Sequence, residues 1–386
     1  MKRIGAAMIA ILAIACEKVD TGIEPDPPNA DFSKYVSMGT SVTMGFASDG
    51  VNSSTQETSW AKLLADDVGA TFTLPLIDAP GCPPPLRAPL GLLMRIDNSS
   101  ISTTTTCAPN SAGVTLPAQN VALTGQTAGD AVTANPPGGT VAARVIPISQ
   151  TQVSAMRSQS PTFVSVEFGA NEVFRAFNGL ASSAVPFSTF SANYTTIINN
   201  VEQTGAKALL ALLPADVSTF PALRTSAEIA SQRTGFGTLN VSVNANCDAS
   251  SNLVALTKIL SVMATGAARA AGGLGPADFS CADVPGSADG ILTAADVTTL
   301  NALMVQMNTF ITAQATANGY ATFSLGTLYD TAKSGNTFDL LTVLTSTTPF
   351  GARFSLDGVH PSLAGHQVLM AAAKAGIIAK YGSITK

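Results

Sequence analysis

The sequence predicts an α/β fold with a mostly parallel sheet. Short runs of aliphatic, β-branched and aromatic residues alternate with longer segments whose apolar residues have helical spacing. This alternation is typical of strands joined by crossover helices. Three of the runs end at turns that combine glycine with polar residues, where open parallel sheets place their sites. The length of 386 residues is compatible with two or three domains, and also with one domain that carries insertions.

The expected elements follow one another in order. We expect strands at residues 32–38, 161–168, 206–213 and 320–328, a buried strand end at 120–123, and helices at 59–68, 188–204, 293–317 and 362–380. Segment 206–213 has helix-forming residues, but Gly205 before it and Pro214 after it favour a buried parallel strand. Thr293 and Asp296 form a capping box that opens the third helix. The preceding Asp289-Gly290 lacks the Asp-x-Asp spacing of a calcium loop, so capping is the preferred interpretation.

Two stretches interrupt the alternation. Residues 80–139 are rich in Pro, Gly, Ser and Thr, and residues 216–290 show no clear period. We interpret the first as long loops and the second as an insertion or lid. The prediction is therefore a single domain over residues 31–386, with loop insertions at about 80–139 and 216–290 that shape the substrate pocket.

The composition excludes several classes of protein. Charged residues make up 12% of the chain, about half the share in an ordinary soluble domain, and hydrophobic residues make up 46%. Disordered chains have the opposite bias, and a nucleic-acid-binding protein would carry basic clusters that a net charge of −5 does not suggest. Only two histidines are present, so a His-rich metal site is not expected, and chemistry that needs an imidazole must lie near the C-terminus.

The N-terminus has the pattern of an export signal. Lys2 and Arg3 precede a short apolar stretch, too short to span a membrane, that ends in Ala13-Ile14-Ala15-Cys16. Small residues followed by cysteine resemble a bacterial lipobox. We therefore expect a signal peptide over residues 1–15, a lipid on Cys16, and a Pro-containing tether over residues 16–30. The alternative is an ordinary cleaved signal with an incidental cysteine. The lipid would anchor the exported protein to a bacterial membrane, and the sequence leaves open which membrane.

Four cysteines remain after Cys16. An even number in an exported protein suggests disulfides, and four cysteines allow three connectivities. The nearest-neighbour pairing, Cys82 with Cys107 and Cys247 with Cys281, would close loops in regions rich in small and turn-forming residues.

A small set of residues could carry out acyl transfer. A serine hydroxyl needs an imidazole to remove its proton, and a carboxylate must orient that imidazole. Ser41 follows a strand and a glycine, and Asp357 precedes His360 by three positions. The tetrahedral oxyanion also needs donors, for which Gly125 could supply a backbone N–H and Asn171 a side-chain amide.

Four blocks of sequence make these residues resemble the GDSL, or SGNH, hydrolase family. Residues 39–45 (GTSVTMG) are similar to its Gly-Asp-Ser-Leu block, 120–127 (NVALTGQT) to its second block and 169–172 (GANE) to its third. Residues 357–366 (DGVHPSLAGH) resemble the last block closely. The blocks occur in the family's order and extend across about residues 32–381.

The resemblance implies a three-layer α/β/α flavodoxin-like sandwich. It implies that Ser41 is the nucleophile, His360 the base and Asp357 its orienting partner. The oxyanion hole would consist of the backbone N–H groups of Ser41 and Gly125 and the side chain of Asn171. No metal or cofactor is implied.

Two positions depart from the family's pattern. Thr40 replaces the aspartate of Gly-Asp-Ser, and Glu172 replaces the aspartate that usually follows the asparagine. We expect both to affect rate more than mechanism.

Other conspicuous side chains have simpler interpretations. We expect His366 and Trp60 to pack in the core. Phe174 and Phe177 could line an acyl pocket, but core packing is the preferred interpretation.

The resulting hypothesis is a serine-dependent carboxylic-ester hydrolase that forms an acyl-enzyme. Its substrate would be a small-molecule, lipid or carbohydrate ester, its partners would include a membrane but no nucleic acid, and it would be a monomer. Two alternatives remain open: an acyltransferase to sugar hydroxyls, and a catalytically silent surface-binding protein on the same fold.

Overall fold

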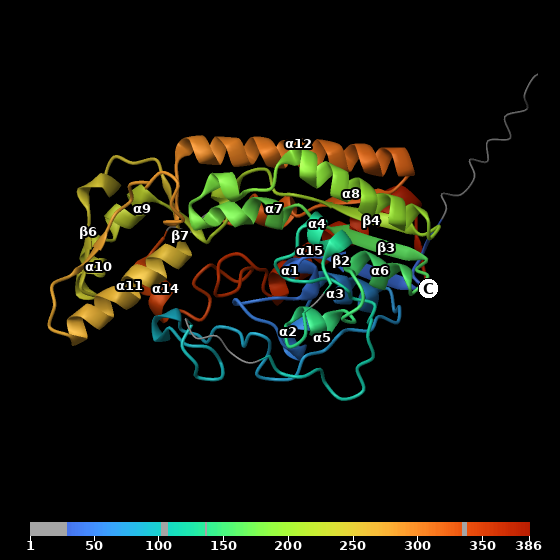
Figure 1. Cartoon of the computed structure of the whole chain (residues 1–386), viewed down its shortest axis with the longest axis horizontal. Helices are drawn as coiled ribbons and strands as arrows, with labels where there is room; N and C mark the ends of the chain where they lie inside the picture. The colour runs from blue at the N-terminus through green and yellow to red at the C-terminus, as the bar shows by residue number, and fades with distance from the viewer. Residues whose placement is uncertain (1–28, 102–106, 136, 334–337) are drawn as a thin grey trace, which may run out of the picture.

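A parallel sheet lies among the helices in one half of the protein, on the right in Figure 1. The structure, a computed structural model, describes residues 29–101, 107–135, 137–333 and 338–386. Within them the sheet has the order β10-β4-β3-β2, and each neighbouring pair is parallel. Its strands are β2 (Tyr35–Gly39), β3 (Phe163–Glu167), β4 (Lys207–Leu212) and β10 (Ala321–Ser324). The mostly parallel sheet that the sequence predicts is thus confirmed.

The strand end expected at residues 120–123 extends this sheet beyond β2. Asn120 forms a parallel bridge with Ser37. The N–H groups of Val121 and Leu123 donate to the carbonyls of Ser37 and Gly39 at 2.9 and 3.0 Å. The second sequence block therefore lies beside the first, at the edge of the sheet.

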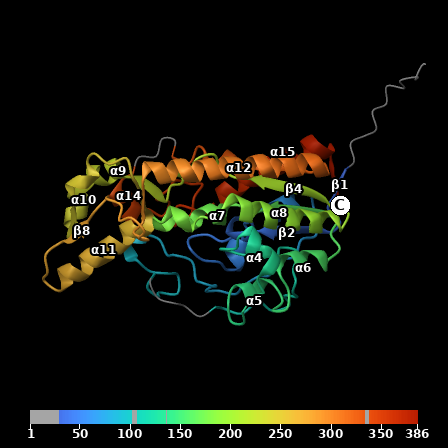
Figure 2. The same cartoon turned by 45° about the horizontal axis from the view of Figure 1, so that its top comes forward.

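Helices cover both faces of the sheet, which gives three layers (Figure 2). All residues of β2 and β3 are buried, as expected for strands covered on both sides. One face packs against α3 (Trp60–Asp67) and α15 (Leu363–Tyr381). The helices on the other face are α6 (Gln152–Arg157), α8 (Phe187–Glu202) and α12 (Ala294–Asn318). The α/β/α sandwich is confirmed.

The long helices begin and end close to where their sequences predict. The capping box at α12 is present, because Thr293 N–H donates to Asp296 Oδ2 at 2.9 Å and Asp296 N–H donates to Thr293 Oγ1 at 3.2 Å. The last strand is shorter than expected. It ends at Ser324, whose hydroxyl accepts the N–H of Gly326 and turns the chain into α13 (Gly326–Tyr329).

The two ends of the described chain meet. Strand β1 (Ala30–Asp31) pairs in parallel with β11 (Ile384–Thr385), and Ala30 is buried, so the last residue of the expected tether belongs to the fold. The expected signal peptide and Cys16 lie outside the described residues, as does most of the tether. In the described ranges, no helix combines the length and apolar character needed to cross a membrane.

The loop prediction for residues 216–290 is wrong, because this segment forms regular secondary structure. Its elements are β5 (Leu223–Thr225), α9 (Ser226–Ser231), α10 (Arg233–Thr238), β6 (Val241–Val243), β7 (Leu253–Ala255), α11 (Leu256–Ala271) and β8 (Ala277–Phe279). Strand β9 (Ile291–Leu292) completes an antiparallel sheet with β5 and β7. We call residues 216–292 the insertion subdomain; it lies beyond one end of the central sheet (Figure 1).

Small residues hide the helical period of α11 in the sequence. Its buried side chains, Leu256, Ile259, Leu260 and Met263, have helical spacing, but alanine, serine, threonine and glycine fill most of the other positions. By contrast, the described residues between 80 and 139 are mostly irregular and form, as helices, a short 3₁₀ turn (Leu90–Leu92) and α4 (Ala128–Thr133).

The cysteines pair as nearest neighbours. The Cα atoms of Cys82 and Cys107 are 4.3 Å apart, and those of Cys247 and Cys281 are 5.0 Å apart. The first disulfide joins two parts of the irregular stretch, and the second lies inside the insertion subdomain.

The remaining short helices are α1 (Ser41–Met44), α2 (Ser53–Gln56), α5 (Ala142–Val145), α7 (Ala170–Phe174) and α14 (Leu340–Thr345).

Candidate active site

The serine of the first block lies at the turn from β2 into α1. Thr40 is the N-cap, and Ser41 is the first residue of the helix. Ser41 is 4% exposed, and its Oγ lies 2.8 Å from His360 Nε2. The strand delivers the hydroxyl to the carboxyl end of the sheet, as expected for a site in an open parallel fold.

A carboxylate orients the imidazole from the other side. His360 Nδ1 lies 2.8 Å from Asp357 Oδ2, and Asp357 Oδ1 accepts the backbone N–H groups of Val359 and His360, both at 2.8 Å. Asp49 N–H also donates to Asp357 Oδ2, at 2.7 Å. The structure therefore brings Ser41, His360 and Asp357 together in one hydrogen-bonded chain. When Nδ1 carries the ring proton, Nε2 is free to accept a proton from the serine.

The charges of the pair shift both pKa values. Burial alone would raise the pKa of Asp357, but the His360 charge and the hydrogen bonds outweigh it and lower the pKa to about 2. Burial alone would lower the pKa of His360, but the Asp357 carboxylate outweighs it and raises the pKa above 6.5. The Asp357 carboxylate thus stabilises the protonated, imidazolium form of His360.

The predicted oxyanion-hole residues lie on neighbouring elements. The N–H of Ser41 begins α1 and has no intrahelical acceptor. Gly125 has φ +74°, and a Cβ added there would meet no heavy atom within 4 Å, so the turn borders open space. Asn171, in α7, donates from Nδ2 to the carbonyl of Gln126 at 2.8 Å. The side-chain amide of the third block is therefore held beside the turn of the second.

Gln152 joins two of these turns, and the sequence interpretation missed it. Its Oε1 accepts the N–H of Gly39 at 3.0 Å, and its Nε2 donates to the carbonyl of Gly39 at 3.0 Å and to Gln126 Oε1 at 2.5 Å. Gln152 is fully buried in α6. No local signal marks this residue, because its partners lie more than 25 positions away.

Thr40 binds a buried carboxyl group that the sequence interpretation also missed. Its N–H donates to Glu167 Oε2 at 3.0 Å, and its Oγ1 lies 2.9 and 2.8 Å from the two Glu167 oxygens. Thr43 Oγ1 donates to the same carboxyl group at 3.0 Å. Burial raises the pKa of Glu167 even against these hydrogen bonds. A Cβ on Gly39 would lie 2.8 Å from the Glu167 carbonyl, so only glycine allows β2 to approach β3 here. Glu167 is the one charged residue in the run 161–168, a signal that could have marked it.

Glu172 connects the third block to the second. Its Oε1 accepts the N–H of Ala128, at the start of α4, at 2.6 Å. Burial raises the pKa of Glu172 to about 7. The longer side chain at this departure from the family's pattern thus reaches the helix that follows the Gly125 turn.

His366 and Trp60 pack in the core, as predicted. Both are at most 1% exposed, and His366 Nδ1 accepts the N–H of Trp60 at 3.3 Å. Burial lowers the pKa of His366 to about 3. His366 is therefore neutral at ordinary pH and braces α15 against α3.

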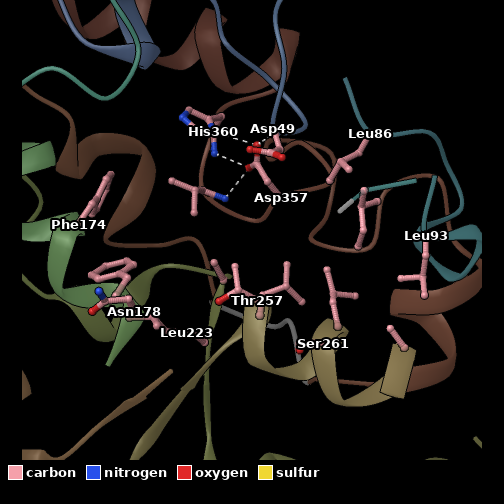
Figure 3. A pocket seen from close by; sticks show the side chains of 18 of the residues that line it. Asp49, Leu86, Leu93, Phe174, Asn178, Leu223, Thr257, Ser261, Asp357 and His360 are labelled. Carbon is pink, nitrogen blue, oxygen red and sulfur yellow. Dashed lines mark hydrogen bonds and ion pairs between the residues drawn. The ribbon is translucent and has the colours of Figure 1, made fainter. Parts of the chain in front are cut away.

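A largely apolar cavity of about 660 Å³ opens beside the catalytic chain (Figure 3). His360 and Asp357 lie on one side of it, and Thr257 and Ser261 of α11 lie across from them. We call it the proximal cavity. Phe174 and Phe177 pack against Phe220, in agreement with the preferred core interpretation, and they also line the cavity, which was the alternative left open. The insertion subdomain supplies much of the wall, so residues 216–290 border the candidate site, where we expected them to shape a pocket.

The chain matches the protein-family model described as GDSL-like lipase/acylhydrolase over residues 35–373. Among curated proteins, none matches it. Solved structures that resemble it include an extracellular lipase from Streptomyces rimosus, with 13% identity, a TM-score of 0.40, and coverage of 89% of this chain and 99% of that one. Another is an acetylxylan esterase from Geobacillus stearothermophilus, with 13% identity, a TM-score of 0.38, and coverage of 90% and 95%. These scores describe distant similarities of shape.

Proposed function

The chain belongs to the GDSL-like lipase/acylhydrolase family and is a carboxylic-ester hydrolase, and we propose that its reaction proceeds through Ser41 and a covalent acyl-enzyme. The observation that carries this proposal is the 2.8 Å contact between Ser41 Oγ and His360 Nε2, continued at 2.8 Å to Asp357. It is the arrangement that activates a hydroxyl for attack on an acyl carbon.

In the first half-reaction His360 takes the proton of Ser41 as Oγ attacks the ester carbonyl carbon. The carbonyl oxygen becomes an oxyanion beside the N–H groups of Ser41 and Gly125 and the amide of Asn171. His360 then gives its proton to the departing alkoxide, which leaves as an alcohol, and the acyl group remains on Oγ. In the second half-reaction His360 activates a water molecule, which releases the carboxylic acid and restores Ser41.

The decisive experiment replaces the nucleophile. We expect Ser41→Ala to lower kcat for p-nitrophenyl butyrate by about a thousandfold or more, with an unchanged thermal melt. A fluorophosphonate probe should label Ser41 in the wild-type protein, and peptide mapping would identify the modified residue. Ser362→Ala is a matched control, because it also removes a helix-associated hydroxyl but lies at the N-cap of α15. Wild-type turnover by Ser41→Ala would refute the proposal.

The same experiments test the two alternatives. If a folded, disulfide-bonded protein is neither labelled nor active, the chain is a silent binding protein. If labelling occurs but acyl groups pass to a polysaccharide acceptor faster than to water, the protein is an acyltransferase.

We also propose that the protein is exported and anchored by a lipid on Cys16. The support is the N-terminal sequence alone, with Lys2 and Arg3 before a short apolar stretch and small residues before the cysteine. A bacterial host expressing the full chain should incorporate labelled palmitate and retain the protein in its membrane fraction. Cys16→Ala should abolish both. Membrane retention of Cys16→Ala would contradict the anchor.

A further inference from the structure

A second largely apolar cavity adjoins the one beside the catalytic chain. It has a volume of about 620 Å³, and its lining includes Leu239, Leu344 and, on α11, Met263 and Ala267. We call it the distal cavity. Leu93 lines both cavities, and it is the one residue in the described part of the chain that does so. The two cavities are therefore adjacent, and the Leu93 side chain lies between them.

One face of α11 forms a common wall. Leu256, Leu260 and Ala264 line the proximal cavity, and Ala267 and Ala270 line the distal one. Spacings of three and four residues place these side chains on one side of the helix. From the first to the last of them, α11 rises about 21 Å. The three alanines leave space where larger side chains would fill it.

The loop that carries Leu93 is held firmly against the catalytic region. Leu93 has φ +52°, a conformation that L-residues other than Asn and Asp rarely adopt, and its carbonyl accepts the N–H of Ile101 at 3.1 Å. The nearby Arg95 is 6% exposed and donates to the carbonyls of Asp49 and Pro84 at 2.9 and 2.8 Å. Figure 3 places Leu93 at the far side of the proximal cavity from Phe174.

We propose that the acyl chain of the substrate runs from Ser41 along α11, through the proximal cavity and past Leu93 into the distal one. This inference rests on the proposed function and names its substrate class: esters of long, unbranched fatty acids. The acetyl group of an acetate ester is too short to fill either cavity. Each methylene added to the acyl chain would move from water into contact with an apolar wall. The free energy of burying one methylene corresponds to about a fourfold gain in kcat/KM. Leu93 is then the residue that sets the usable chain length.

The test compares p-nitrophenyl butyrate, octanoate and palmitate, each below the concentration at which it forms micelles. For the wild-type protein we expect kcat/KM to rise from butyrate to octanoate and again to palmitate. Leu93→Trp should narrow the passage and lower the palmitate-to-butyrate ratio of kcat/KM by roughly tenfold, the effect of about two methylenes. A ratio taken within one protein sample cancels any loss of folded material.

Ala267→Trp tests the distal cavity without changing Leu93. It should lower the palmitate-to-octanoate ratio, because only the longer chain reaches beyond Leu93. The matched control is Val305→Trp, which adds an aromatic side chain at an exposed position of α12 and lines neither cavity. It should leave all three rates unchanged.

Two failures can be told apart. If the wild-type protein hydrolyses none of these esters, the proposed function fails. If it hydrolyses them but prefers butyrate, or if both tryptophan variants in the cavities keep the wild-type ratios, only the acyl-chain path is overturned.

Discussion

At the scale of single residues, three acidic groups raise the pKa of His360. Asp357 contacts Nδ1 directly, and the more exposed Asp49 and the buried Glu167 add smaller negative potentials. Because His360 must be neutral to accept the serine proton, activity should fall as the pH drops through its pKa, which lies above 6.5.

Asp49→Asn should lower the pKa of His360 and move the acidic limb of the kcat/KM profile to lower pH. The sign follows from the loss of a negative charge, which makes the imidazolium less stable. Asparagine suits the site, because it tolerates the φ of +53° there and keeps the backbone N–H that binds Asp357.

The shift should shrink at high salt, since the Asp49 carboxylate is partly exposed. Asp66→Asn, which removes an exposed carboxylate paired with Lys62 in α3, is the control and should leave the limb in place. An identical limb in Asp49→Asn and wild type, or a limb moved to higher pH, would show that Asp49 does not act on His360.

At the scale of elements, the turn between β2 and α1 is tied to β3 through Glu167. Thr40 supplies both a backbone and a side-chain donor to this fully buried carboxyl group. The aspartate usual in the family would instead place a second carboxylate against Glu167. Threonine at position 40 and glutamate at position 167 are therefore a compatible pair.

Thr40→Asp should destabilise the protein by roughly 2–3 kcal/mol, the upper part of the range for single substitutions, because it buries two acidic groups in contact. Chemical denaturation at pH 7 measures the loss. Adding Glu167→Gln should restore most of it, since the glutamine can accept from one neighbour and donate to the aspartate. If Thr40→Asp alone keeps the wild-type free energy of unfolding, the site around Glu167 tolerates a second buried acidic group.

At the scale of the whole molecule, the insertion subdomain supplies the α11 wall of the proximal cavity, and its buried side chains are continuous with the core around the central sheet. The Cys247–Cys281 bridge closes a loop of 34 positions within it. Such a bridge contributes about 3–4 kcal/mol by restricting the unfolded chain.

Replacing both Cys247 and Cys281 by serine should lower the Tm by on the order of 5 °C. Calorimetry measures the change, and full reduction of the wild-type protein, which also opens the Cys82–Cys107 bridge, should lower the Tm at least as far. If the double variant melts at the wild-type temperature, the bridge adds no stability to the subdomain.

The residues of the proposed triad could be selected from sequence because each lies in a short block with its own pattern. Asp357 and His360 are three positions apart in one loop, and Ser41 follows a strand and a glycine. The supporting residues could not be predicted in this way. Gln152 and Glu167 contact the Ser41 turn across more than 100 positions, and such contacts leave no local motif. The single charge in the run 161–168 marks Glu167 itself but does not identify its partner.

The alternation of apolar runs was sufficient to specify a parallel sheet between helices, because strands buried on both faces must be apolar throughout. The order of the four blocks was sufficient to identify the family. The helices and strands of the insertion subdomain could not be predicted from the sequence pattern, since small residues obscure the helical period of α11. Which side chains line the two cavities depends on how α11, the Leu93 loop and Phe174 pack together. Cavity shape arises from packing between distant segments, so it became visible only in the folded chain.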